Sequence, residues 1–161
     1  MSDRLRPRGL ASLGNASGIK YRAIRDARDE SRTLRQARIL MVDDEESNLV
    51  ILRRVLERAG YSSLAQTTNS YQAKPLYLEF QPDLICLDLH MPGLDGFGVL
   101  EQLAEVIPTS TYLPILMLTG DSSAAAAQRA LSLGARDFVT KPFAPHEVLL
   151  RIHNLLEPRF M

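Results

Sequence analysis

The sequence has almost no cysteine, no long apolar run and no excess of one charge. Its single cysteine, Cys86, excludes an internal disulfide and suits a reducing compartment. No stretch approaches the roughly 20 apolar residues that a helix needs to span a bilayer, and the N-terminus lacks the apolar core of a signal peptide. We therefore expect a cytoplasmic protein that does not insert into a membrane.

The 161 residues, of which 45% are hydrophobic and 24% charged, are enough for one ordinary domain with a full core. The charges balance but are unevenly placed: residues 1–36 hold nine Lys and Arg against four Asp and Glu, and the remainder holds ten against fifteen. A basic arm can contact nucleic acid, anionic lipid or another protein, but a solvated leader is the simpler interpretation. We therefore predict no direct nucleic-acid binding.

Residues 1–36 are predicted to form a basic leader and a polar helix, followed by a folded domain over 37–161. The leader mixes Arg, Pro, Gly, Ser and Ala without a hydrophobic period. Residues 19–36 carry opposite charges four apart, for example at Arg22 and Asp26, which favours a helix. Its apolar stripe is thin, so this helix must dock, pair with a second copy to form a homodimer, or fray.

From Ala37 onward, short β-rich runs alternate with segments of helical period. This alternation predicts βα units, a parallel sheet and a doubly wound α/β fold. We predict strands near 38–43, 62–67, 83–88, 113–119 and 136–140, and helices near 47–59, 70–80, 96–107, 123–133 and 145–156. In the third helix we expect the buried stripe to be Phe97, Leu100, Ala104 and Ile107.

Glycine and proline positions agree with this division. Gly60 and Gly134 follow the first and fourth helices, as expected of C-terminal caps, and Pro145 lies where the last helix begins. Pro75 is the exception because it falls inside the second predicted helix and removes a backbone donor there. We therefore expect that helix to start late, kink or fray.

Polar side chains end four of the predicted strands. Asp43 and Asp44 follow the first strand, Asp88 the third, Thr119 the fourth and Lys141 the fifth. If the strands are parallel neighbours, these groups converge on one crevice at the carboxyl edge of the sheet, where open α/β folds bind ligands.

This set of side chains suits phosphate and magnesium chemistry. Mg²⁺ prefers oxygen ligands, and neighbouring carboxylates need a cation to offset their mutual repulsion. Lys141 and Thr119 add an ammonium and a hydroxyl that an incoming phosphoryl group can contact. We therefore predict Mg²⁺ as the cofactor and Asp88 as the nucleophile.

Four short segments surround these polar residues. They are Val42-Asp43-Asp44-Glu45, Leu87-Asp88-Leu89-His90-Met91-Pro92-Gly93-Leu94-Asp95-Gly96, Leu118-Thr119-Gly120 and Phe138-Val139-Thr140-Lys141-Pro142-Phe143. Each segment alone is common, but four in order, each at a strand end, form a specific pattern. On these segments the region from 38 to 156, about three quarters of the chain, resembles the receiver domains of two-component response regulators. The resemblance implies a flavodoxin-like sheet with strand order 2-1-3-4-5.

The resemblance also implies how the site works. Asp88 would accept a phosphoryl group from a histidine kinase or a histidine phosphotransfer protein, in the presence of Mg²⁺. Asp44 would bind the metal directly and Asp43 directly or through water. Asp88 and the backbone carbonyl of His90 would complete the protein ligands.

A conformational switch is implied as well. Lys141 would contact the phosphoryl oxygens, Thr119 would move toward them, and Phe138 would turn inward behind Thr119. The peptide bond between Lys141 and Pro142 would be cis. Phosphorylation adds a charge of roughly −1.5 to −2, which favours this second state. The changed surface would lie on the fourth helix, the last strand and the last helix, where a downstream protein, an output domain or a second copy could bind.

His90 and Asp121 lie two residues beyond Asp88 and Thr119. We expect both side chains to overlook the phosphoryl group and to tune the lifetime of the acyl phosphate. Asp121 would repel phosphate or orient water, and a protonated His90 would offset it. Two exposed side chains without kinetic effect are the alternative.

The residues therefore indicate a phosphorylation-controlled signalling module rather than a conventional enzyme. One alternative is a receiver-like scaffold that binds partners without phosphorylation, although no acidic or lysine ligand has been lost. Another is a phosphohydrolase that uses Asp88, although it lacks an obvious general acid unless His90 serves. Because only residues 157–161 follow the last helix, we expect no output domain within this chain.

Overall fold

The computed structural model describes residues 34–160, which form a parallel sheet with helices on both faces. The strand order is β2-β1-β3-β4-β5, as the resemblance implies. The strands are β1 (Arg38–Val42), β2 (Ser63–Thr67), β3 (Leu84–Leu87), β4 (Ile115–Thr119) and β5 (Asp137–Thr140), and each pairs in parallel with its neighbours. Most of the predicted leader and polar helix lies outside the described residues.

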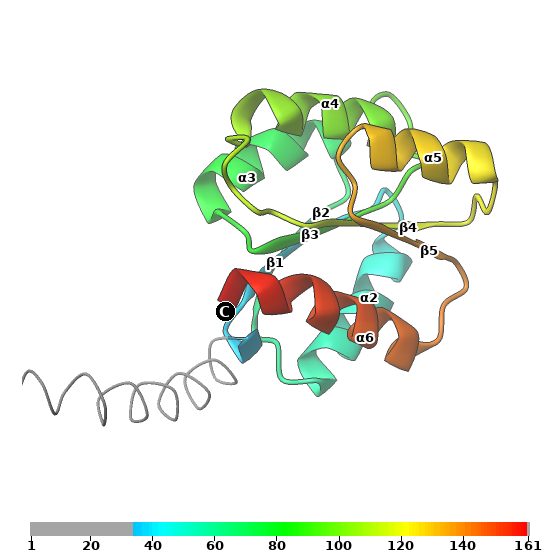
Figure 1. The fold of residues 1–161 in the computed structure, drawn as a ribbon. Coiled ribbons are helices and arrows are strands. Elements are labelled where there is room, and N and C mark those ends of the chain that lie inside the picture. Colours follow the sequence, from blue (N-terminus) through cyan, green and yellow to red (C-terminus); the bar gives the residue numbers. More distant parts are fainter. Residues whose placement is uncertain (1–33, 161) are drawn as a thin grey trace, which may run out of the picture. The chain divides into compact units, whose positions relative to one another are not determined.

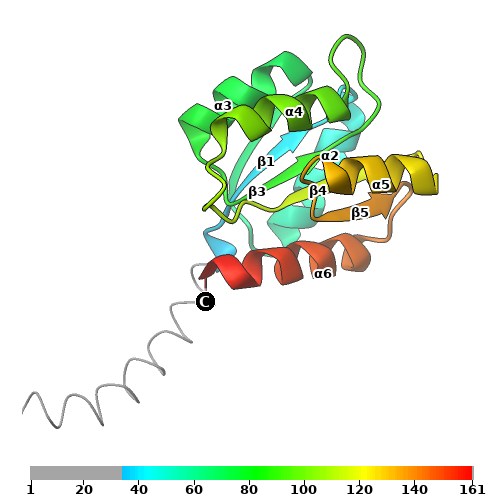
Figure 2. The same cartoon turned by 45° about the horizontal axis from the view of Figure 1, so that its top comes forward.

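Two layers of helices cover the sheet. In Figures 1 and 2, α3 (Ala73–Phe80), α4 (Gly96–Val106) and α5 (Ala124–Ser132) lie on one face, and α2 (Glu46–Arg58) and α6 (Pro145–Leu156) lie on the other. The alternation of β1 divides its side chains between them: Ile39 and Met41 pack with α2 and α6, whereas Leu40 and Val42 pack with α3, α4 and α5. Both faces of the central strands are therefore buried, which explains their continuous apolar sequences.

The helix ends follow local capping chemistry. Asp95 accepts a hydrogen bond from the Gly98 amide at the start of α4, and Ser123 accepts one from the Ala126 amide at the start of α5. Gly60 and Gly134 have positive φ angles of 98° and 114°, so the expected glycine caps are confirmed. Pro145 begins α6, also as expected.

The expected effect of Pro75 is confirmed as a late helix start. A 3₁₀ turn (Ser70–Gln72) precedes α3, which begins only at Ala73, so Pro75 lies in the first α-helical turn. Backbone N–H groups have no intrahelical partner in a first turn, so the proline removes nothing that α3 needs.

The buried stripe of α4 differs from the expected one. Leu100 is buried as expected, but Ala104 is exposed, and Val99 and Leu103 complete the stripe. Gly96, the first residue of α4, is also buried and lies against the backbone of Asp88 and Leu89, just beyond β3. Phe97 is only half-buried.

The order of the strands creates the crevice. β2 lies on one side of β1, and β3 lies on the other side. The connection that follows β1 and the connection that follows β3 therefore run in opposite directions along the edge of the sheet. Polar residues at the ends of these two strands therefore lie where the two connections part. None of the described helices is both long enough and apolar enough to cross a membrane.

Gly96 is expected to be intolerant of any side chain. An added Cβ would lie 2.5 Å from the backbone oxygen of Asp88 and 2.8 Å from the Cα of Leu89, both of them backbone atoms. We predict that Gly96→Ala lowers the free energy of unfolding by about 1–3 kcal/mol, as overpacking does. Urea denaturation would measure this.

Gly120→Ala is the matched control, because a Cβ at Gly120 would meet nothing within 4 Å. Its free energy of unfolding should change by no more than about 1 kcal/mol. Equal stabilities of the two variants would contradict the close approach of α4 to β3.

Candidate functional site

Backbone hydrogen bonds fix the polar residues that follow the strands. The amide of Asp43 donates to Thr67, that of Asp88 to Val42 at 2.9 Å, and that of Lys141 to Thr119 at 2.7 Å. The sheet ladder thus continues one residue beyond the apolar runs. Each polar side chain is held where its strand meets the crevice.

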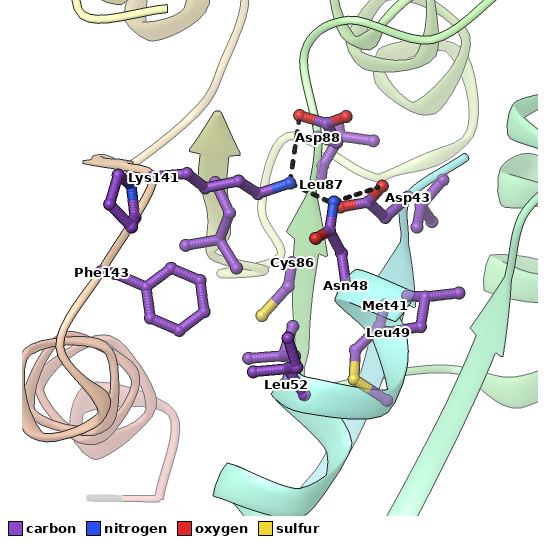
Figure 3. Close-up of a pocket in the computed structure, with 14 residues that line it drawn as sticks. Met41, Asp43, Asn48, Leu49, Leu52, Cys86, Leu87, Asp88, Lys141 and Phe143 are labelled. Carbon is purple, nitrogen blue, oxygen red and sulfur yellow. Dashed lines mark hydrogen bonds and ion pairs between the residues drawn. The ribbon is translucent and has the colours of Figure 1, made fainter. Parts of the chain in front are cut away.

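An ammonium lies between two buried carboxylates (Figure 3). The Nζ of Lys141 is 2.6 Å from Oδ2 of Asp43 and 3.6 Å from Oδ1 of Asp88. Asp43 and Asp88 are only 6% and 8% exposed. Buried charges of this kind persist only where they are paired or bind a cation, so the pairing compensates part of the local negative charge.

Asp44 adds a third carboxylate. Ligand oxygens of Asp43, Asp44 and Asp88 all lie within 4.8 Å of one another. One ammonium cannot neutralise three carboxylates, and hard oxygen donors at this spacing match what Mg²⁺ requires. The residues present therefore fit the implied divalent ion.

Burial dominates the titration of Asp88. The pKa of its carboxyl is raised from 3.8 to about 6, chiefly by desolvation, which outweighs the lowering effect of the neighbouring Lys141 ammonium. The charges of Asp43 and Asp44 raise it further, while the hydrogen bond from the Leu89 amide to Oδ1 of Asp88, at 2.9 Å, lowers it. An anionic Asp88 in this place is costly to the folded protein.

Thr119, Asp121 and His90 form a second group at the mouth of the crevice. Thr119 is fully buried, and its hydroxyl oxygen accepts a hydrogen bond of 3.2 Å from the Asp121 amide. Hydrogen bonds from Ser123 lower the pKa of the Asp121 carboxyl, which favours the anion. Nε2 of His90 lies 3.3 Å from Oδ2 of Asp121, so these two side chains form a pair.

The remaining predicted residues lie around this centre. Phe138 is half-buried and packs on the side of the sheet that carries α4 and α5. The peptide between Lys141 and Pro142 is cis, as the resemblance implies.

Asn48 is a site residue that the sequence pattern does not predict. Its side-chain amide, from the first turn of α2, lies 3.4 Å from Oδ1 of Asp43. An Asn shortly after an acidic pair at a helix start is the signal that could have indicated it, because such side chains hydrogen-bond locally.

A cavity of about 400 Å³ adjoins the charged groups (Figure 3). Asp43, Asn48, Asp88 and Lys141 lie at one end, and most of its other lining side chains are apolar. Burial raises the pKa of the Cys86 thiol in its wall to about 12, so this cysteine stays a neutral packed group, as expected.

Curated proteins give the first comparison. PhoP of Bacillus subtilis, an alkaline phosphatase synthesis transcriptional regulatory protein, is 41% identical over 119 residues, which cover 74% of this chain and 48% of PhoP. The chemotaxis protein CheY of Thermotoga maritima is 30% identical over 118 residues, which cover 73% of this chain and 96% of CheY. The chain thus spans about half the length of relatives such as PhoP.

Solved structures give the second comparison. A response regulator structure from Chloroflexus aurantiacus has a TM-score of 0.69 at 31% identity, covering 75% of this chain and 98% of that one. CheY4 of Vibrio cholerae has a TM-score of 0.68 at 29% identity, covering 75% and 99%. The family model of the response regulator receiver domain matches residues 39–153. The chain therefore belongs to the family of response regulator receiver domains.

Proposed function

We propose that this receiver domain accepts a phosphoryl group on Asp88 from a phosphohistidine of a histidine kinase or phosphotransfer protein, and that the phosphorylated form changes its protein contacts. One observation carries the proposal: a buried carboxylate lies at a sheet edge beside two further carboxylates and one ammonium. A scaffold that only binds partners would not need three clustered carboxylates and an ammonium, whereas a phosphoryl acceptor would.

Asp43, Asp44, Asp88 and the His90 backbone carbonyl would hold Mg²⁺, with Asp44 as a direct ligand and Asp43 as a direct or water-mediated one. When bound, the ion supplies positive charge to the phosphoryl oxygens. Metal binding by carboxylates also favours the anionic form of Asp88, which the buried site otherwise disfavours.

The transfer itself is a displacement at phosphorus. A carboxylate oxygen of Asp88 forms the new O–P bond as the P–N bond to the donor imidazole breaks, and the bonding pair leaves with that nitrogen. The Lys141 ammonium already lies near Asp88, so it could move from Asp43 to contact the phosphoryl oxygens. The product is an acyl phosphate that later reacts with water.

The added charge would drive the switch. The Thr119 hydroxyl is an acceptor for the Asp121 amide in this structure, so its own proton is available to a phosphoryl oxygen. Movement of Thr119 would let Phe138 turn inward from its half-buried position. A shift of this kind changes the surface of α5, β5 and α6, where a downstream protein, an output domain or a second copy would bind.

The relatives point to the kind of output. PhoP and ResD of Bacillus subtilis are named transcriptional regulatory proteins, whereas CheY is named a chemotaxis protein. In this chain the output contact would be made by protein surfaces of the receiver domain, with no direct contact to nucleic acid. We propose a signalling role, not that of a conventional enzyme.

Asp88→Asn should abolish phosphorylation. With Mg²⁺ and a small radiolabelled phosphodonor, the wild-type protein should take up about one phosphoryl group per chain, because it has one acceptor carboxylate, and the variant should take up none. Asp83→Asn is the control, since Asp83 precedes β3 and pairs with Arg159 away from the crevice. No labelling of the wild type would favour a scaffold, and sustained turnover of unrelated phosphoesters would favour a hydrolase.

The raised pKa of Asp88 predicts a pH-dependent stability difference. Without divalent ions, both states hold the proton below about pH 4, and only the folded state holds it between about 4 and 6. Ionisation above that range should cost the wild type about 2–3 kcal/mol of folding free energy relative to Asp88→Asn.

Denaturation of both proteins at pH 4 and pH 7 checks this. The stability advantage of Asp88→Asn should increase on going to pH 7. An advantage that is the same at both pH values would show that Asp88 titrates near its ordinary pKa.

The pair of His90 and Asp121 should set the lifetime of the acyl phosphate. Removing the Asp121 carboxylate in Asp121→Ala removes a charge that can orient water, so dephosphorylation should slow several-fold. His90→Ala leaves Asp121 without its partner at 3.3 Å and should speed it. The decay of labelled protein after removal of the donor measures both, and unchanged decay in both variants would leave them as exposed side chains without kinetic effect.

A further inference from the structure

Asn48 connects α2 to the charged centre. Its Nδ2 lies 3.4 Å from Oδ1 of Asp43 (Figure 3). The same Nδ2 lies 3.3 Å from Oε2 of Glu45. The contact with Asp43 is partly buried, whereas that with Glu45 is exposed and is weakened by water. The partly buried contact is therefore the one that can influence the site.

The two oxygens of Asp43 have separate partners. Oδ1 accepts hydrogen bonds from the Glu45 amide at 2.9 Å and from Asn48. Oδ2 accepts one from the Lys141 ammonium at 2.6 Å. Donors from the start of α2 thus fix one oxygen, and the plane of the carboxylate aims the other at Lys141.

This division also determines where Lys141 lies. Its Nζ is 1 Å closer to Asp43 than to Asp88, at 2.6 Å against 3.6 Å. At Asp88, the two interactions found among the described residues, with the Leu89 amide and with Lys141, both involve Oδ1. Oδ2 of Asp88 is thus the oxygen available to attack phosphorus.

We infer that Asn48 is a positioning residue for phosphoryl transfer: it orients Asp43, which holds Lys141 beside Asp88 and not on it. This inference rests on the proposed acceptor role of Asp88. Without the Asn48 amide, Oδ1 keeps only the Glu45 amide, the Asp43 carboxylate rotates more freely, and Lys141 moves toward Asp88. A closer Lys141 neutralises the nucleophile and restricts access to it.

Labelling rates test the kinetic part. At saturating Mg²⁺ and donor, Asn48→Ala should lower the rate constant about three- to tenfold. Asn48→Asp, which has the same shape but lacks the N–H donors and adds a charge beside Asp43, should lower it further, and Asn48→Gln, which keeps the donors, should recover part of the loss. Ser47→Ala, at an exposed position in the same helical turn, is the matched control and should retain the wild-type rate.

A spectroscopic measurement separates this inference from the proposed function. In the unphosphorylated protein without metal, the ¹⁵N signal of the Lys141 ammonium should shift in Asn48→Ala and stay in place in Ser47→Ala. Thermal unfolding of all variants shows whether the fold is retained. A wild-type Lys141 signal or a wild-type labelling rate in a folded Asn48→Ala protein would overturn the inference. If the wild type itself takes no label, the proposed function fails and the Lys141 signal alone decides the role of Asn48.

Discussion

The structure depends on an imbalance of charge in one buried crevice, where the carboxylates of Asp43, Asp44 and Asp88 share a single ammonium from Lys141. Carboxylates removed from water repel one another strongly, and burial, together with the charges of Asp43 and Asp44, raises the pKa of Asp88 to about 6 in spite of Lys141. This unfavourable arrangement is relieved by binding positive charge. Under the proposed function a divalent ion would supply this positive charge, so the same imbalance that costs stability favours cation binding, and the bound cation would in turn attract an anionic phosphoryl group.

The fold tolerates this cost because the sheet holds the backbone of the charged residues in place. Apolar strands β1 and β3 are buried on both faces, and their backbone ladder extends to the amides of Asp43 and Asp88. These bonds fix the backbone from which each carboxylate extends. On the other side, α2 supplies donors to Asp43, and the segment after β5 supplies Lys141, so elements distant in sequence hold one small cluster.

Most of the architecture could be predicted from local pattern and strand ends. The alternation of β-rich and helical segments predicted the five strands, and polar residues after apolar runs predicted the meeting of Asp43, Asp44, Asp88 and Lys141, because the carboxyl ends of parallel strands share an edge. The buried stripe of α4 was less predictable. It depends on how the helix is seated on the sheet, where Gly96 lies against the backbone of Asp88 and Leu89. Asn48 escaped prediction for a similar reason, since its role depends on which oxygen of Asp43 it meets.

Gly120, by contrast, follows the buried Thr119 with open space around the position of a missing side chain. Substitutions at Gly120 should therefore have little effect on the packing of the core. Under the proposed function, a side chain at this position would lie beside Thr119, the residue that would contact the phosphoryl group. The lifetime of the signal could then diverge between related proteins through one permissive position, while the buried residues beneath it stay unchanged.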